Sequence, residues 1–141
     1  MGRIYFNARR EKLTVDGAYT VKASDSGKVF MLSSTAGACE ITLPTPGGTG
    51  DDKAVEGLYY KFIVEEDTPT GVITIAAGDS IIDLVMKDIG GDASNSTAGT
   101  QVDNILIAVA TKQGDYINMF TDGTTWYAES MSSTNNSITT S

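Results

Sequence analysis

The sequence predicts an all-β protein: an antiparallel β-sandwich or barrel-like domain of about eight short strands, with an extended N-terminal arm. Apolar and polar residues alternate in several short runs, and no stretch repeats apolar residues with the period of an amphipathic helix. Turn-forming Gly, Asp, Ser and Pro separate these runs at a spacing of roughly ten residues. The lack of helices between the strands disfavours a parallel α/β architecture.

The predicted strands lie within residues 15–130, which we expect to form one β domain. The clearest is 58–66, where every second residue from Leu58 to Val64 is apolar. The run 102–110 is apolar enough to be buried on both faces. Long polar loops are expected at 45–57 and 87–101. The other predicted strands are 18–23, 28–33, 39–43, 72–77, 81–86, 116–121 and 124–130.

The two ends of the chain differ from this domain. Residues 131–141 are rich in Ser, Thr and Asn, and we expect a flexible, disordered tail.

Residues 1–14 form the predicted arm. The net charge is −8, but residues 1–12 carry +3 and the remainder carries −11. An acidic body disfavours nucleic acid as a partner. The basic arm suits docking on an acidic protein surface or a neighbouring copy, although a solvated, partly disordered arm is an equally good interpretation.

Seven residues of the arm are candidates for docking, because the aromatic and aliphatic side chains can anchor while the cations meet acidic groups. They are Arg3, Ile4, Tyr5, Phe6, Arg9, Arg10 and Lys12. No apolar run is long enough for a signal peptide or a membrane helix. We therefore expect a soluble protein, made in the cytoplasm, with no membrane partner.

The residue types needed for catalysis are scarce. The chain has no histidine, which excludes a Ser-His-Asp triad, a Cys-His pair and the usual zinc sites. Cys39 alternates with apolar residues and fits a small buried hydrophobe. The acidic run 65–67 enters a turn, where solvated acids are usual, and this disfavours a carboxylate-dependent hydrolase. No calcium-loop pattern is present. We expect no enzyme activity, no catalytic or metal-binding residue, and no cofactor.

The remaining candidate residues are aromatic. We expect them in the core or at a subunit interface, and core packing is the simpler interpretation for most of them. They are Tyr59, Tyr60, Phe62, Tyr116, Phe120, Trp126 and Tyr127. Asp122 and Gly123 are expected to supply the positive backbone angles of a tight hairpin turn, and Gly27 a second turn. Alternation then places Trp126 and Tyr127 on opposite faces, one in the core and one available to a neighbouring subunit.

Three stretches together resemble the capsid decoration proteins of tailed bacteriophages, also called cement or head-stabilising proteins. They are "VKASDSGKVFMLSSTAGACEITLPTP" (21–46), "EGLYYKFIV" (56–64) and "INMFTDGTTWYAES" (117–130). The resemblance implies an all-β homotrimer on the exterior of the virion capsid, made in the host cytoplasm. Such a protein reinforces contacts between capsomers of the major capsid protein. The acidic loop 45–57 and the Ser/Thr-rich end depart from the pattern.

Two other binding functions remain open from the sequence. The polar loops and the closing hairpin also fit a head- or tail-fibre module that binds a host-surface glycan, although no repetitive shaft is present. A free-standing carbohydrate-binding domain is a weaker alternative, because such a domain is expected to expose more than the single tryptophan of this chain.

Overall fold

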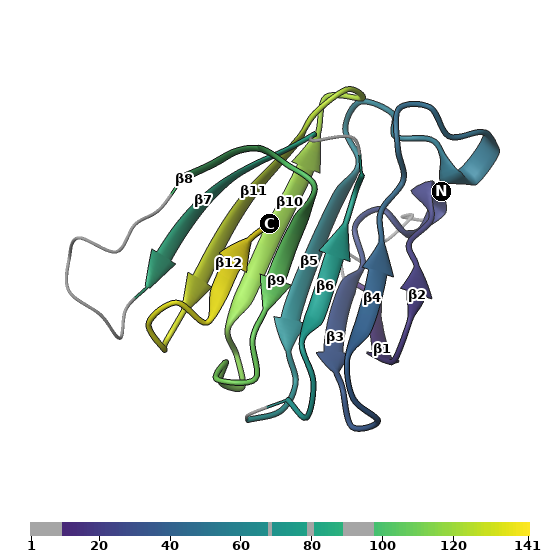
Figure 1. The fold of residues 1–141 in the computed structure, drawn as a ribbon. Coiled ribbons are helices and arrows are strands. Elements are labelled where there is room, and N and C mark those ends of the chain that lie inside the picture. The colour runs from purple at the N-terminus through teal and green to yellow at the C-terminus, as the bar shows by residue number, and fades with distance from the viewer. Residues whose placement is uncertain (1–9, 68, 79–80, 89–97) are drawn as a thin grey trace, which may run out of the picture.

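The computed structural model describes residues 10–67, 69–78, 81–88 and 98–141. Within these residues the protein is all-β, with two mixed sheets and two short 3-10 helices (Figure 1). The seven-stranded sheet has the order β1 (Lys12–Asp16), β3 (Val29–Ser33), β5 (Tyr59–Val64), β10 (Tyr116–Thr121), β11 (Trp126–Ser132), β7 (Ile82–Asp88) and β8 (Ala98–Val102). The five-stranded sheet has the order β12 (Ile138–Thr140), β9 (Asn104–Ile107), β6 (Ile73–Ala76), β4 (Cys39–Thr42) and β2 (Tyr19–Thr20).

The first six strands alternate between the two sheets, so the chain winds around the core (Figure 1). As a result β1, β3 and β5 are parallel neighbours in one sheet, and β2, β4 and β6 are parallel neighbours in the other. A parallel pair needs a crossover connection, which is usually a helix. Here each crossover is a strand of the opposite sheet, and the prediction of a purely antiparallel domain was therefore wrong.

The second half of the chain completes both sheets mainly with antiparallel strands. Strand β10 lies between β5 and β11 and is antiparallel to both. Strand β7 pairs with the other edge of β11, away from β10, and is parallel to it. In the second sheet, β9 is antiparallel to both β6 and β12.

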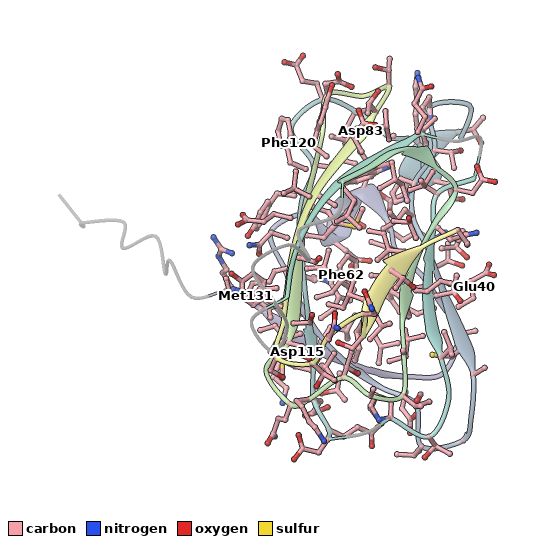
Figure 2. The ribbon with its side chains drawn as sticks, turned by 60° about the vertical axis from the view of Figure 1, so that its left-hand side comes forward. Glu40, Phe62, Asp83, Asp115, Phe120 and Met131 are labelled. Atoms are coloured by element: carbon pink, nitrogen blue, oxygen red, sulfur yellow. The ribbon has the colours of Figure 1, made fainter. Side chains whose placement is uncertain are left out.

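One hydrophobic core lies between the sheets, and Phe62 points into it in Figure 2. Its centre is aromatic: the ring centroids of Tyr60 and Trp126 are 5.4 Å apart, and those of Phe30 and Phe62 are 5.1 Å apart. The polar ends of these rings are satisfied, because Trp126 Nε1 donates to the carbonyl oxygen of Pro44 at 3.0 Å and the Tyr60 hydroxyl donates to that of Lys22 at 2.9 Å.

Both ends of the chain differ from the sequence prediction. Strand β11 extends to Ser132, and β12 places Ile138 in the core with 2% of its surface exposed. Residues 131–141 are therefore part of the fold rather than a disordered tail. At the other end, β1 begins at Lys12, and Val15 is buried, so the predicted boundary at residue 14 falls inside a strand. Arm residues 1–9 lie outside the described residues.

Four internal predictions also need correction. In the run 102–110, Val102 ends β8 and residues 104–107 form the short strand β9. The residues of β9 alternate between buried and partly exposed rather than being buried on both faces. Only Tyr19 and Thr20 of the predicted strand 18–23 are in a strand. The loop 45–57 carries the 3-10 helix η2 (Gly50–Asp52) and a bridge between Thr45 and Lys53. The described part of the predicted loop 87–101 contributes to β7 and β8.

The C-terminal strand supplies a stability prediction. Replacing Ile138 by Ala should lower the free energy of unfolding by about 2–4 kcal/mol, because it removes buried methyl groups and leaves a cavity. Thr139→Ala is the matched control on the same strand, where the side chain is only half-buried, and should cost less than about 1 kcal/mol. Urea unfolding measures the free energy of unfolding of both variants. Equal losses in the two variants would show that Ile138 of β12 does not contribute to the core.

Candidate interaction face

The outer surface of the seven-stranded sheet carries a row of aromatic side chains. Phe120 on β10 is paired with Tyr59 on β5 and with Tyr127 on β11, so the three rings lie side by side on one face. Phe120 and Tyr127 are 44% and 45% exposed, although aromatic rings in a monomer are usually more covered. Figure 2 shows Phe120 on the outer side of the sheet, opposite to Phe62.

A shallow groove of about 260 Å³ follows this row. Its lining combines rings with two polar side chains from the adjacent row of the sheet, Asn118 and Glu129, which are paired across β10 and β11. We call this surface the aromatic groove, and it consists of Tyr59, Asn118, Met119, Phe120, Tyr127, Ala128 and Glu129. Such a mixture of flat apolar surface and a few hydrogen-bonding groups is typical of a recognition site.

The apolar surface continues beyond the groove along the same face. Tyr116 lies in register with Ile63 and Met131, and the Lys61 ammonium lies 4.7 Å from the centroid of the Tyr116 ring. Val85 on the neighbouring strand β7 is 53% exposed. The outer face of this sheet is thus the largest concentration of exposed aromatic and aliphatic side chains among the described residues.

The basic arm meets this face at the groove. The guanidinium of Arg10 lies 5.1 Å from the centroid of the Tyr59 ring, and its Nη1 donates to the Tyr59 hydroxyl at 3.3 Å. That hydroxyl in turn donates to Asn118 Oδ1 at 3.2 Å. Lys12 pairs with Glu65 at 3.5 Å on the surface, a contact of small energetic value. The described chain therefore begins at one wall of the groove.

The connection after β10 positions the ring of Tyr127. It contains four residues, 122–125, rather than the predicted two-residue turn. Gly123 has a φ of +95°, but Asp122 is not among the residues with positive φ, so that part of the prediction was wrong. Asp122 Oδ1 instead accepts the backbone N–H groups of Thr124 and Thr125, each at 2.8 Å. Its Oδ2 accepts the hydroxyl of Tyr127 at 3.2 Å.

These hydrogen bonds control ionisation at the turn. The backbone N–H groups of Thr125 and Thr124 stabilise the carboxylate and lower the pKa of Asp122 to about 2. The negative charge of Asp122 raises the pKa of the Tyr127 hydroxyl, which therefore stays protonated and available as a donor. Gly27, the other predicted turn residue, has a φ of +87° and donates its N–H to the Tyr59 carbonyl at 2.7 Å.

The structure divides the predicted aromatic set into two groups. Tyr60, Phe62 and Trp126 are buried in the core, whereas the outer face carries Tyr59, Tyr116, Phe120 and Tyr127. Trp126 and Tyr127 point to opposite faces, as alternation along the strand predicts. Sequence reasoning missed Asn118 and Glu129. Their outward position follows from the alternation of the two strands, but their pairing across the sheet does not.

The other residues considered for chemistry, Cys39 and the acidic run 65–67, lie where they support the fold. Burial raises the pKa of the Cys39 thiol, which disfavours the reactive thiolate. Glu66 accepts the backbone N–H of Ser34 at 2.7 Å, and Asp67 accepts that of Gln113 at 2.9 Å, so these acids anchor neighbouring loops. Among the described residues no cluster of three or more Cys, Asp and Glu side chains has the arrangement of a metal site.

The same part of the chain contains no helix that is long and apolar enough to span a membrane.

The fold and the site together define an all-β domain with an exposed aromatic face on one of its two sheets. No protein-family model, curated protein or solved structure matches the chain.

The turn at Asp122 gives a pH prediction. The folded-state pKa lies below the unfolded value of about 3.9, so the carboxylate stabilises the fold above that value and its contribution is lost as the pH falls toward 2. Wild type should therefore be more stable than Asp122→Asn at pH 7, and the difference should shrink between about pH 4 and pH 2. Thermal unfolding across this range measures it. A constant difference would contradict the role of the charge.

Gly123 gives a second prediction at the same turn. Valine is strained at a φ of +95°, and its Cβ would lie 3.2 Å from the backbone nitrogen of Glu56. Gly123→Val should lower the free energy of unfolding by about 1–3 kcal/mol. Gly47→Val is the control, since its Cβ meets open space and its φ is not positive. Equal unfolding midpoints for the two variants would contradict this account of the turn.

Proposed function

We propose that this chain is a structural virion protein: a decoration, or cement, protein on the outer surface of a tailed-bacteriophage capsid. It stabilises contacts between capsomers of the major capsid protein and assembles as a homotrimer. The observation that carries this proposal is the exposed aromatic face of the seven-stranded sheet, which the basic arm joins at Arg10. The resemblance of residues 21–46, 56–64 and 117–130 to decoration proteins supports the same role.

The physical properties of the face suit protein-protein contact. Tyrosine and phenylalanine bury large areas at little conformational cost, and they are enriched at interface centres. We describe the two facing sheets as a β-sandwich, in which one hydrophobic core joins both sheets. Several copies joined in one ring would add their separate contacts as avidity, and threefold symmetry is one closed arrangement that allows this.

The arm supplies the second contact in this proposal. Its candidate docking residues combine four cations with three large apolar side chains: Arg3, Ile4, Tyr5, Phe6, Arg9, Arg10 and Lys12. Of these, only Arg10 and Lys12 belong to the described residues, and both are exposed at the β1 edge of the sheet. Cations guide the approach to an acidic surface, and buried apolar side chains slow release.

A second candidate function is supported by the polar lining of the groove. The rings of Tyr59, Phe120 and Tyr127 offer flat apolar surface, and Asn118 and Glu129 offer hydrogen-bonding groups beside them. This arrangement also suits a glycan, as expected for a head- or tail-fibre module. Binding of soluble oligosaccharides that is lost in Phe120→Ser, without any binding to shells, would favour this function.

The docking role of the arm is tested on shells assembled from the cognate major capsid protein. Deletion of residues 1–9 leaves β1 intact and should reduce co-sedimentation with shells at least tenfold, because it removes two of the four docking cations and all three apolar anchors. Arg3→Glu/Arg9→Glu should weaken binding in the same direction. The control, Lys53→Glu/Lys112→Glu, changes the net charge equally at exposed positions outside residues 1–14. Full binding by the deletion variant would contradict the proposed role.

A further inference from the structure

The aromatic groove has binding groups that the fold does not use. Glu129 is exposed, and no hydrogen bond or ion pair joins its carboxylate to another described residue. Asn118 uses its Oδ1 as an acceptor for Tyr59, which leaves its amide N–H groups available. Phe120 and Tyr127 expose almost half of their surface. The groove thus presents an acceptor, donors and two rings to an occupant that the described residues do not include.

The charge around the groove favours a cationic occupant. Glu129 lines the groove, Asp122 lies at the base of Tyr127, and Asp83 is paired with Tyr127 across β7 and β11. Two cations oppose these three acids: Arg10 at the Tyr59 wall, and Lys61, which is paired with Asn118 and lies over the ring of Tyr116. The balance is still acidic. An occupant with positive charge and aromatic or aliphatic side chains would therefore match both the acidic groups and the rings.

The chain itself contains a segment with these properties. Residues 1–9, "MGRIYFNAR", hold two arginines, no acidic residue and the consecutive apolar side chains of Ile4, Tyr5 and Phe6. The segment joins the described structure at Arg10, which already lies on the Tyr59 wall of the groove. Its chemistry complements the groove, and its attachment point is at the groove.

The length of the segment is sufficient. Nine extended residues reach about 30 Å. Neighbouring strands are about 4.8 Å apart, so the distance across the sheet from β5 over β10 to β11 is about 10 Å. The three apolar residues are four to six positions before Arg10, which corresponds to at most roughly 13–20 Å of extended chain. They can therefore reach the rings of Phe120 and Tyr127.

We propose that the aromatic groove is a peptide-binding site whose occupant in the free protein is residues 1–9 of the same chain. The apolar side chains of the segment pack against Phe120 and Tyr127, and an arginine pairs with Glu129. Attachment at Arg10 gives the segment an effective concentration in the millimolar range, which a second copy in dilute solution does not reach. Docking of the same segment on a shell would then begin with its release from the groove.

The test uses the full chain without shells, so its failure is separate from a failure of the proposed function. Trypsin cleaves after Arg3, and mass spectrometry follows the N-terminal product. Phe120→Ser/Tyr127→Ser should increase the cleavage rate at Arg3 at least fivefold, because the segment loses its partner. The control, Val72→Ser/Val109→Ser, removes similarly exposed apolar side chains from the loops before β6 and after β9 and should leave the rate unchanged. Equal rates in wild type and the groove variant overturn the proposal.

A second experiment keeps the proposal testable if the groove variant unfolds. A synthetic peptide of residues 1–9 should bind to a chain that lacks these residues, and Glu129→Gln in that chain should weaken binding at least fivefold. Failure of the peptide to bind overturns the proposal. If the protection of Arg3 from trypsin disappears on dilution and light scattering gives an oligomeric mass, the groove binds residues 1–9 of a second copy. This result would also overturn the proposal. If a soluble glycan binds in the groove of wild type without accelerating cleavage at Arg3, residues 1–9 do not occupy the groove, and the proposal is overturned.

Discussion

The packing of Trp126 against Tyr60 between the two sheets is the interaction on which the rest of the structure depends. The two rings come from β11 and β5, which flank β10, and the indole N–H is satisfied by the carbonyl of Pro44. Side chains alternate along a strand, so fixing these rings inside also fixes which residues face outward. Tyr59 and Tyr127 are the outward neighbours of the buried pair. A one-residue slip would bury Glu129 and expose Trp126, which makes this register strongly preferred.

The exposed aromatic face is therefore a consequence of the core. The same register that buries Phe62 and Met119 places Lys61, Asn118 and Phe120 on the outer surface. The hydrogen bonds of Asp122 then hold the hairpin and orient the hydroxyl of Tyr127. Tyr59 and Tyr127 are each held by a side-chain hydrogen bond, which reduces the conformational entropy that they would lose on association, as the proposed role requires.

The sequence predicted the parts of the structure that are governed by local alternation. The run 58–66 has the predicted faces, and Trp126 and Tyr127 separate as expected. Long-range pairing could not be read from the pattern: the winding of the first six strands makes parallel pairs, although connections without helices suggested antiparallel ones. The end of the chain was misjudged because Ile138 is one apolar residue in a polar stretch, and its burial depends on pairing with β9. Asn118 and Glu129 were missed for the same reason, since only the pairing of β10 with β11 brings them together.

An electron cryomicroscopy map of purified virions tests the central claim most directly, namely that this domain works by joining protein surfaces through the aromatic face and the basic arm. The account predicts density for the two-sheet body on the exterior of the shell, with the outer face of the seven-stranded sheet covered by protein. Virions that lack this density, or a bound domain whose aromatic face points to solvent, would contradict the account.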